Sequence, residues 1–447
     1  MDESFTGLFY FNSHGQLKWS GLFTFGTDQV PMQTDKPTFK SLLTPAVIVA
    51  ALGYFVDIYD LLLFGIVRKG SLTDLGIVGE ANRDAGEFLI SMQMYGMLIG
   101  GILWGILGDK KGRLNVLFGS IITYSIANIA NGMVHSLEAY AFWRFIAGVG
   151  LAGELGAGIT LVTETLPKNK RGYGTMIVAS VGLIGAIVAN LVYQTLQDWR
   201  ICYYAGGVLG LLLLFLRVSV RESGMFKSME VQQSSKGKFI SLFNDSKRFG
   251  KYIKCILIGI SLWFVVGVLI TFAPEFAKYL NVQGAESIAA GKAIAWCYAG
   301  LVVGDLTTGL LSQKLKSRKK VMAIFLVLNL VMMMIYLHAE GVSSTMFYVL
   351  CMLLGFSNGY WVIFVTIAAE QFGTNIRATV TTTVPNFVRG SLPLIILGYQ
   401  FFRDQTFSGN IIHASMVMGV LLSSIAFLAL WKMKETFAED LDYTETI

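Results

Sequence analysis

Long apolar stretches separated by short polar segments recur along almost the whole chain. A helix that spans a bilayer needs about 20 mostly apolar residues, and twelve stretches meet this need. Their bounds are 43–67, 86–108, 114–133, 139–163, 173–195, 199–218, 252–274, 289–313, 319–337, 345–369, 379–401 and 411–433. Their length and their glycine and alanine content favour helices, because a membrane barrel would show alternating segments of about 10 residues. The pattern predicts an all-α integral membrane protein with twelve transmembrane helices.

The composition supports a membrane protein and argues against soluble classes. Of the 447 residues, 54% are hydrophobic and only 14% are charged, whereas about 25% of an ordinary soluble domain is charged. The four cysteines stand singly in apolar runs, without the spacing of a disulfide framework or a zinc site. No metal cluster, nucleotide loop or Ser/His/Asp arrangement is evident in the sequence. We therefore expect neither an enzyme nor a metal or cofactor site.

Lysine and arginine residues gather in alternate loops, and such loops usually lie in the cytoplasm. The segments on the side of both termini carry most of them, at 110–113, 168–171, 217–254 and 314–320. The opposite loops carry few, namely Arg68, Lys69, Arg83, Arg200, Lys278, Lys292 and Arg403. The net charge of +6 is thus a topology signal, and no nucleic-acid partner is expected. We expect a plasma (inner) membrane protein with both termini in the cytoplasm.

No cleavable signal peptide is evident at the N-terminus. Residues 1–42 are predicted to form a cytoplasmic tail. A more ordinary N-terminal sequence begins at Met32, so residues 1–31 need not belong to the functional protein.

Two pairs of motifs repeat along the chain at nearly the same offset. Residues 105–113 follow the second span, and a similar segment at 309–318 follows the eighth, 204 residues later. Residues 164–172 end the fourth span, and 370–378 end the tenth, 206 residues later. This repetition predicts two pseudo-symmetric six-helix bundles with a site between them, the architecture of alternating-access carriers. The expected parts are bundles at 43–218 and 251–433, a cytoplasmic linker at 219–250 and a cytoplasmic tail at 434–447.

Several motifs resemble signatures of the major facilitator superfamily. Residues 105–113, G-I-L-G-D-K-K-G-R, resemble its loop 2–3 signature, and R-x-x-x-G-x-G at 144–150 resembles its fourth-helix signature. E-T-L-P-K-N-K-R-G at 164–172 resembles its loop 4–5 signature, and R-E-S at 221–223 resembles the P-E-S after helix six. The resemblance covers residues 43 to 433 approximately and implies the two-bundle transporter fold.

Two further segments look like the metabolite:proton, phosphate and aromatic-acid symporter branches of that superfamily. They are Y-F-V-D-I-Y-D at 54–60 and Gly153-Glu154. Helix five lacks the G-P motif of antiporters, which argues against a drug exporter.

Ionisable side chains inside the predicted spans are functional candidates, because charge in lipid is costly. Asp57 and Asp60 share one face of the first helix, and Arg144 lies at comparable depth in the fourth, where an ion pair can form. A carboxyl that gains and loses Arg144 during transport could load and release a proton. The alternative is a fixed, self-neutralising bridge. Glu154, roughly 15 Å deeper, is either a proton carrier or a packing carboxyl bonded to helix-one or helix-two backbone.

Arg389 lies near the middle of the eleventh span, with Asn386 on the same face and prolines on both sides. A guanidinium can hold a carboxylate or phosphate bidentately, so we expect it to bind a substrate anion. The alternative is a salt bridge to an acid of helix seven or eight. The acids lie in the first half and Arg389 lies in the second, so we expect the first half to bind protons and the second half to bind the substrate anion. Neutral cavity candidates are Tyr54, Gln93, Asn128, Trp263, Asn358, Tyr360 and Trp361.

Residues at the cytoplasmic helix ends are expected to latch neighbouring helices in one conformation. They are Gly105, Asp109, Lys110, Gly112, Arg113, Glu164, Arg171, Asp305, Glu370 and Arg377. For Asp305 a helix-dipole or latch role is preferred over a direct role in transport. For residues 109–113 the alternative is ordinary topology charge.

Together these features favour a proton-coupled symporter that imports a small organic anion by alternating access. Its expected partners are that substrate, protons and lipid, and we expect a monomer. Carriers of amino acids, osmolytes or inorganic phosphate are alternatives within the same class. A non-transporting membrane receptor or sensor is the alternative from another class, although no extra cytoplasmic domain for signalling is evident.

Overall fold

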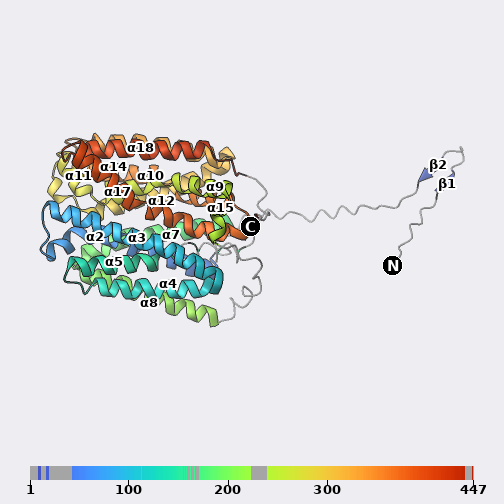
Figure 1. Ribbon diagram of the computed structural model, residues 1–447, viewed down its shortest axis with the longest axis horizontal. Coiled ribbons are helices and arrows are strands. Elements are labelled where there is room, and N and C mark those ends of the chain that lie inside the picture. Colours follow the sequence, from blue (N-terminus) through green and yellow to red (C-terminus); the bar gives the residue numbers. More distant parts are fainter. Residues whose placement is uncertain are drawn as a thin grey trace. The chain divides into compact units, whose positions relative to one another are not determined.

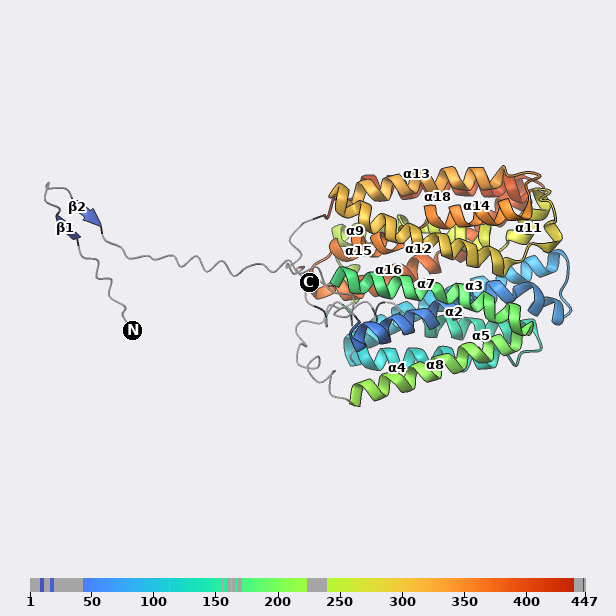
Figure 2. The same cartoon turned by 180° about the vertical axis from the view of Figure 1, so that it is seen from behind.

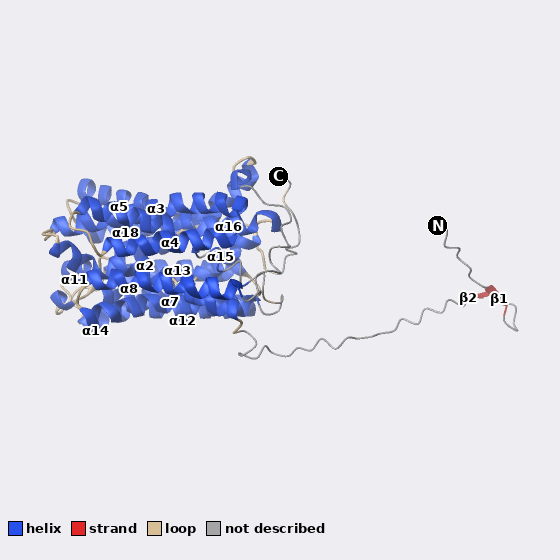
Figure 3. Cartoon of the chain, turned by 90° about the horizontal axis from the view of Figure 1, so that it is seen from below, coloured by secondary structure: helices blue, strands red, loops and turns tan. Residues whose placement is uncertain are grey.

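Helices dominate the computed structural model of the chain (Figures 1 and 3). The structure describes residues 43–111, 113–154, 171–222 and 239–437, and single positions at 156, 158, 162, 166 and 445. It also describes two short N-terminal strands, β1 (Phe9–Phe11) and β2 (Leu17–Trp19), which pair antiparallel. The strands belong to a separate unit, residues 1–41, from the helical unit. No strand was predicted there, although aromatic and β-branched residues favour strands.

The helices of the first predicted half are long and mostly unbroken. They are α2 (Pro45–Asp74), α3 (Glu80–Lys111), α4 (Arg113–Asn131), α5 (Leu137–Leu151), α7 (Arg171–Leu196) and α8 (Trp199–Glu222). Side-chain caps define two of the starts. Thr44 accepts a hydrogen bond from the backbone of Val47 at the start of α2, and Ser136 accepts one from Ala139 at the start of α5.

Several helices of the second predicted half are interrupted. The seventh predicted span is built from α9 (Ser246–Leu257), α10 (Ile260–Phe264), the π-helical turn η2 (Val265–Ile270) and α11 (Ala273–Tyr279). The tenth and eleventh are split into α14 (Ser344–Ser357) with α15 (Trp361–Glu370), and α16 (Thr374–Gly390) with α17 (Leu392–Phe401). Continuous helices are α12 (Ala290–Leu315), α13 (Arg318–Leu337) and α18 (Ile411–Trp431), and the short turns are η1 (Phe239–Leu242), η3 (Ala285–Ser287) and η4 (Phe402–Thr406). Pro393 contributes to the break after Ser391, because proline has no backbone N–H to donate.

Nine helices in the described part of the chain are long and apolar enough to cross a membrane. The other three predicted spans fall on α4, α5 and the interrupted α16–α17, so the count of twelve stays a prediction. Large apolar side chains such as Phe215, Leu310 and Trp431 are mostly exposed. Such an apolar surface suits contact with lipid rather than with water.

The helices contact one another mainly within each predicted half, as Figure 2 shows. In the first half α2 packs against α7 and α8, and α5 packs against α3 and α4. In the second half α12 packs against α14, and α13 packs against α18. Contacts between the halves run from α2 and α7 to α12, and from α3 to α16 and α17. A site between the halves is therefore bordered by α2, α3, α7, α12, α16 and α17.

Glycines allow α3 and α5 to meet at backbone contact. A Cβ atom at Gly148 would collide with the backbone carbonyl of Gln93 and approach the backbone nitrogen of Met97. A Cβ atom at Gly96 would likewise collide with the carbonyl of Phe145. Neither backbone can move without shifting its helix, so these positions require glycine.

We expect Gly148→Ala to lower the free energy of unfolding by about 1–3 kcal/mol, the usual cost of overpacking. Gly309→Ala on α12 is the matched control, because no atom lies within 4 Å of its ideal Cβ position. The control should be neutral or slightly stabilising, since alanine favours helices over glycine. Thermal unfolding of both purified variants in detergent measures the difference. Equal melting temperatures would contradict the backbone contact.

Candidate functional site

Asp57 of α2 and Arg389 of α16 meet where the two predicted halves touch. Nη1 of Arg389 lies 3.9 Å from Oδ2 of Asp57, and both side chains are almost fully buried. The guanidinium carbon lies 5.7 Å from the ring centre of Trp263 and 5.5 Å from that of Trp361, within cation–π range. Both Asp57 oxygens, and Nε and Nη1 of Arg389, have no hydrogen-bond partner among the described residues. The charge pair therefore has spare donors and acceptors.

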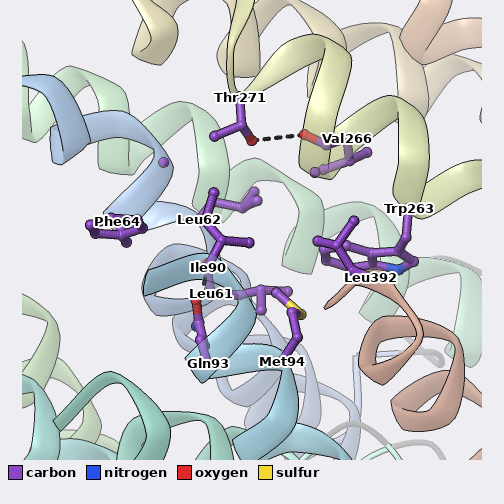
Figure 4. A pocket seen from close by; sticks show the side chains of 12 residues that line it. Leu61, Leu62, Phe64, Ile90, Gln93, Met94, Trp263, Val266, Thr271 and Leu392 are labelled. Atoms are coloured by element: carbon purple, nitrogen blue, oxygen red, sulfur yellow. Dashed lines mark hydrogen bonds between the residues drawn. The ribbon is translucent and has the colours of Figure 1, made fainter. Parts of the chain in front are cut away.

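A small pocket of about 20 Å³ lies between the halves beside Trp263, one of the two rings that flank Arg389 (Figure 4). It is lined from both halves by Leu61, Leu62, Phe64, Gly65, Ile90, Gln93, Met94, Trp263, Val266, Gly267, Thr271 and Leu392. Gln93, Thr271 and the indole N–H of Trp263 are its polar groups. That indole N–H has no hydrogen-bond partner among the described residues, whereas the Thr271 hydroxyl donates to the Val266 carbonyl at 2.8 Å. The lining is thus mostly apolar, and in this closed arrangement the pocket has room for about one water molecule.

Arg144 does not form the expected ion pair with the helix-one aspartates. Its Nη2 donates a hydrogen bond to Oε1 of Gln93, and its guanidinium lies 5.1 Å from the ring centre of Phe64. Asp60 interacts with Arg144 only at longer range, and its carboxylate oxygens have no hydrogen-bond partner among the described residues. The expectation matched depth along two helices. Depth alone does not fix the rotation of each helix about its axis, and this rotation decides which side chain Arg144 meets.

Glu154 also has a partner that the sequence reasoning missed. Both of its carboxylate oxygens accept hydrogen bonds from Arg217 of α8, and both side chains are buried. Gly53 of α2 provides the space for this ion pair, because a Cβ atom there would collide with the Arg217 guanidinium and the Glu154 carboxylate. The expected bond to helix-one or helix-two backbone is replaced by this ion pair. Arg217, counted above among the basic charges of residues 217–254, lies instead in the protein interior.

Asp305 of α12 holds the start of α15. Its Oδ1 accepts a hydrogen bond from the backbone N–H of Val362 at 3.2 Å. A carboxylate at a helix N-terminus interacts favourably with the helix dipole, which is the geometry expected for this residue. Its Oδ2 is buried and has no hydrogen-bond partner in the described part of the chain.

Of the seven predicted substrate residues, Gln93 and Trp263 line the pocket, and the other five do not, namely Tyr54, Tyr360, Trp361, Asn386 and Arg389. Nδ2 of Asn386 donates to the carbonyl of Ala152 at 2.7 Å and so ties α16 to the end of α5. Tyr360 is buried in the turn between α14 and α15. Tyr54 is buried on α2 and interacts electrostatically with Arg389 and Asp57.

Asn358 and Asn128, the remaining neutral candidates, differ in their hydrogen bonding. The Asn358 amide donates to the carbonyl of Leu262 at 3.1 Å. Both amide atoms of buried Asn128 have no hydrogen-bond partner within the described residues.

Two ion pairs that were not predicted join the halves at the end opposite the predicted cytoplasmic side. Nη2 of Arg68 lies 2.6 Å from Oε1 of Glu275. Nη1 of Arg403 lies 2.8 Å from Oε1 of Glu87, whose second oxygen accepts from Gln400 at 2.7 Å. Glu87 lies inside the predicted span 86–108. The criterion that selected Asp57, an ionisable side chain within a span, would therefore have selected Glu87 as well. Arg68 and Arg403 had been counted as ordinary loop charges.

At the opposite end, the expected latch residues of the second half bind within that half. Glu370 accepts from the Thr436 hydroxyl at 2.7 Å and pairs with Arg318 at 3.3 Å. Arg377 donates to the carbonyl of Ala369 at 3.0 Å. A Cβ atom at Gly105 would contact Thr383 at 3.5 Å, so here the first and second halves lie side by side. Gly112, Glu164 and the side chains of Asp109, Lys110, Arg113 and Arg171 lie outside the described residues.

Glu435, after the last helix, caps the start of α13. It accepts hydrogen bonds from the Ser317 hydroxyl and from the backbone N–H of Arg318. Partial burial alone would raise the pKa of this carboxyl, but its side-chain and backbone hydrogen bonds lower the pKa below the ordinary value. The cap therefore stays ionised and holds the C-terminal residues against α13.

Comparisons with known proteins identify a family, related transporters and a solved structure of similar fold. Residues 42–396 match the family model described as "Major Facilitator Superfamily". The putative niacin/nicotinamide transporter NiaP of Bacillus subtilis (strain 168) is 24% identical over 393 residues, which cover 86% of this chain and 94% of the relative. The sialic acid transporter NanX of Escherichia coli (strain K12) is 26% identical over 294 residues, covering 64% and 68%. The crystal structure of a D-xylose-proton symporter has a TM-score of 0.62 at 16% identity, covering 90% of this chain and 99% of that one, and so shares the fold.

Proposed function

Because the chain belongs to the major facilitator superfamily, we propose that it is a proton-coupled symporter that imports a small organic anion. The chain is a multi-pass membrane transporter for a small molecule. The buried pair of Asp57 and Arg389 carries the proposal, because it places a proton acceptor beside an anion receptor at the contact between the halves. The distribution of lysine and arginine supports an inner-membrane location with both termini in the cytoplasm.

Charge balance in a closed, poorly solvated site explains the coupling. In the empty site the negative charge of Asp57 neutralises Arg389. An anion that binds Arg389 alone would leave one uncompensated negative charge, and such a buried charge is costly. A proton on Asp57 removes that charge and frees the guanidinium for the substrate carboxylate. The anion and the proton therefore cross together, and the empty carrier returns with its internal pair restored.

The pocket supports an anion with an apolar body. Most of its lining side chains are apolar, so a polyol or inorganic phosphate would lose hydrogen bonds to water without replacing them. A carboxylate at Arg389 would leave an adjoining apolar ring beside Trp263. The name of the Bacillus subtilis relative makes nicotinate the first compound to test.

Uptake by purified protein in liposomes tests the proposal. An inward proton gradient should drive accumulation of labelled nicotinate or another small carboxylate, and a proton ionophore should collapse it. Saturable uptake whose rate and extent do not depend on the proton gradient would contradict symport. Binding of the anion without any uptake would favour a receptor.

We expect Arg389→Ala to weaken anion binding by about 10- to 100-fold, because a hydrogen bond to a charged group contributes about 1.5–3 kcal/mol. Combining it with Asp57→Asn avoids leaving the aspartate buried without its cation. Arg200→Ala is the matched control, since it removes an arginine that pairs with Asp74 within the first half. Calorimetric titration at constant pH measures the affinity. An unchanged affinity in the double variant would remove Arg389 from the binding site.

A further inference from the structure

Gln93 of α3 is an almost fully buried amide in the pocket lining (Figure 4). Arg144 determines which way this amide points, because Nη2 of Arg144 donates a hydrogen bond to Oε1 of Gln93. A guanidinium has hydrogen-bond donors and no acceptor. The oxygen of Gln93 must therefore face Arg144, and its NH2 group must face the other way.

The NH2 group of Gln93 has spare capacity to donate. Its hydrogen-bond partner among the described residues is the backbone carbonyl of Leu61, and the distance from Nε2 to that oxygen is 3.5 Å, beyond the usual range. Leu61 itself lines the pocket, so the NH2 group lies at the pocket wall. An amide NH2 can donate two hydrogen bonds. At least one N–H of Gln93 is therefore left for a bound molecule.

The other polar groups of the lining also offer donors rather than acceptors. Arg144 already uses the oxygen of Gln93, and the Thr271 hydroxyl donates its hydrogen within its own helix. On the wall from the second half, the indole N–H of Trp263 has no hydrogen-bond partner among the described residues. A polar atom in the body of the substrate should therefore be an acceptor, such as a ring nitrogen or a carbonyl oxygen.

The orientation of the Gln93 amide does not depend on the closed arrangement of the halves. Gln93, Arg144 and Leu61 lie on α3, α5 and α2, which all belong to the first half. A Cβ atom at Gly148 of α5 would collide with the backbone carbonyl of Gln93, so these two helices are in backbone contact beside the amide. Separation of the halves therefore widens the pocket without turning the amide.

We propose that Gln93, oriented by Arg144, selects small carboxylates whose ring carries a hydrogen-bond acceptor. This inference rests on the proposed function, because Arg389 binds the carboxylate while the ring occupies the widened pocket. Gln93 then donates an N–H to the acceptor. A ring without an acceptor leaves that N–H buried and unpaired, which is costly. Nicotinate, which has a ring nitrogen, should therefore bind more tightly than benzoate, which has the same charge and nearly the same shape.

Calorimetric titration of the purified protein with nicotinate and with benzoate, at one neutral pH, tests this selection. The unmodified protein should bind nicotinate more tightly, and Gln93→Met should lower the ratio of the two affinities by about 10-fold. Gln93→Glu keeps an oxygen for Arg144 and serves if the methionine variant does not fold. Beside Arg144 the glutamate stays ionised and offers the ring only acceptors, so the ratio should fall at least as far.

The role of Arg144 as a positioning residue is tested by the same ratio. Arg144→Met lets the amide turn and should lower the ratio, whereas Arg144→Lys retains a donor for Oε1 and should keep most of the preference. Gln194→Met is the matched control, because it makes the same substitution as Gln93→Met on α7 outside the pocket lining. Its ratio should equal that of the unmodified protein.

The outcomes separate this inference from the proposed function. Equal binding of nicotinate and benzoate by the unmodified protein would overturn the inference and leave anion transport intact. An unchanged ratio in Gln93→Glu would also overturn it, because this variant keeps the shape of the side chain and removes only the donor. A fall in Trp263→Phe without a fall in the Gln93 variants would assign the donor to the indole instead. Failure of both carboxylates to bind would overturn this inference together with the proposed anion site.

Discussion

Replacing Asp57 by Asn is expected to abolish proton-driven accumulation while preserving exchange of substrate across the membrane. The variant leaves Arg389 permanently available, so an anion can neutralise it without a proton. A gradient of one pH unit stores about 1.4 kcal/mol per proton and supports about tenfold accumulation for each coupled proton. The variant should instead reach equal concentrations on both sides. Uptake of labelled substrate and exchange against an internal pool measure the two activities separately.

Asp60→Asn is the informative comparison for this experiment. Asp60 lies one helical turn from Asp57 and is equally buried, but it has no ion-pair partner within the described residues. It should retain accumulation if Asp57 carries the coupling proton. Loss of accumulation in Asp60→Asn alone would transfer the coupling role from Asp57 to Asp60.

The sequence was sufficient to identify the buried charges but not their pairing. Asp57, Arg144, Glu154 and Arg389 all lie in apolar runs, where an ionisable side chain is conspicuous. Their partners depend on helix rotation and on contacts between helices far apart in the chain. Arg389 was expected to contact helix seven or eight as its structural alternative, and it contacts helix one instead.

Charges close to the ends of helices were harder to interpret. Arg217, Arg68 and Arg403 fit a count of loop charges equally well whether they face water or the interior. The structure buries all three against carboxylates. A long arginine side chain near a helix end can reach either environment, and spacing along one helix does not distinguish them.

The helix breaks were also only partly predictable. Pro393 marks the break in the eleventh span, but no proline lies at the turn 358–360 or at the π-helical turn η2. Close contact between Gly304 and Gly359 contributes to the first of these breaks, because it brings α12 against the turn backbone. The breaks lie beside Trp361 and Trp263, which flank Arg389. Irregular backbone in the membrane is tolerated where it lines a site rather than faces lipid.

Contacts at both ends close the pocket between the halves. At the predicted outer end the pairs Arg68–Glu275 and Arg403–Glu87 join the halves. At the inner side Asn386 bonds to the carbonyl of Ala152. A substrate can enter from outside only if the outer pairs separate. Their strength therefore helps to set the population of the outward-open form.

Combining Glu87→Gln with Glu275→Gln is expected to shift the conformational equilibrium toward the outward-open form by roughly 100-fold. Each hydrogen bond to a charged group contributes about 1.5 kcal/mol at the low end of its range, so two such losses approach 3 kcal/mol. A cysteine at the pocket position Met94 should then react much faster with a membrane-impermeant maleimide added outside. The four native cysteines are buried, which limits their background reaction.

Asp74→Asn is the matched control for the outer pairs. It breaks the ion pair with Arg200, also at the predicted outer end, but both partners belong to the first half. Its loss should leave the labelling rate at Met94→Cys unchanged, because the two halves move relative to each other without separating Asp74 from Arg200. Equal acceleration in the control would attribute the effect to general loosening of the outer end. No acceleration in the double glutamine variant would show that contacts other than these two ion pairs keep the pocket closed to the outside.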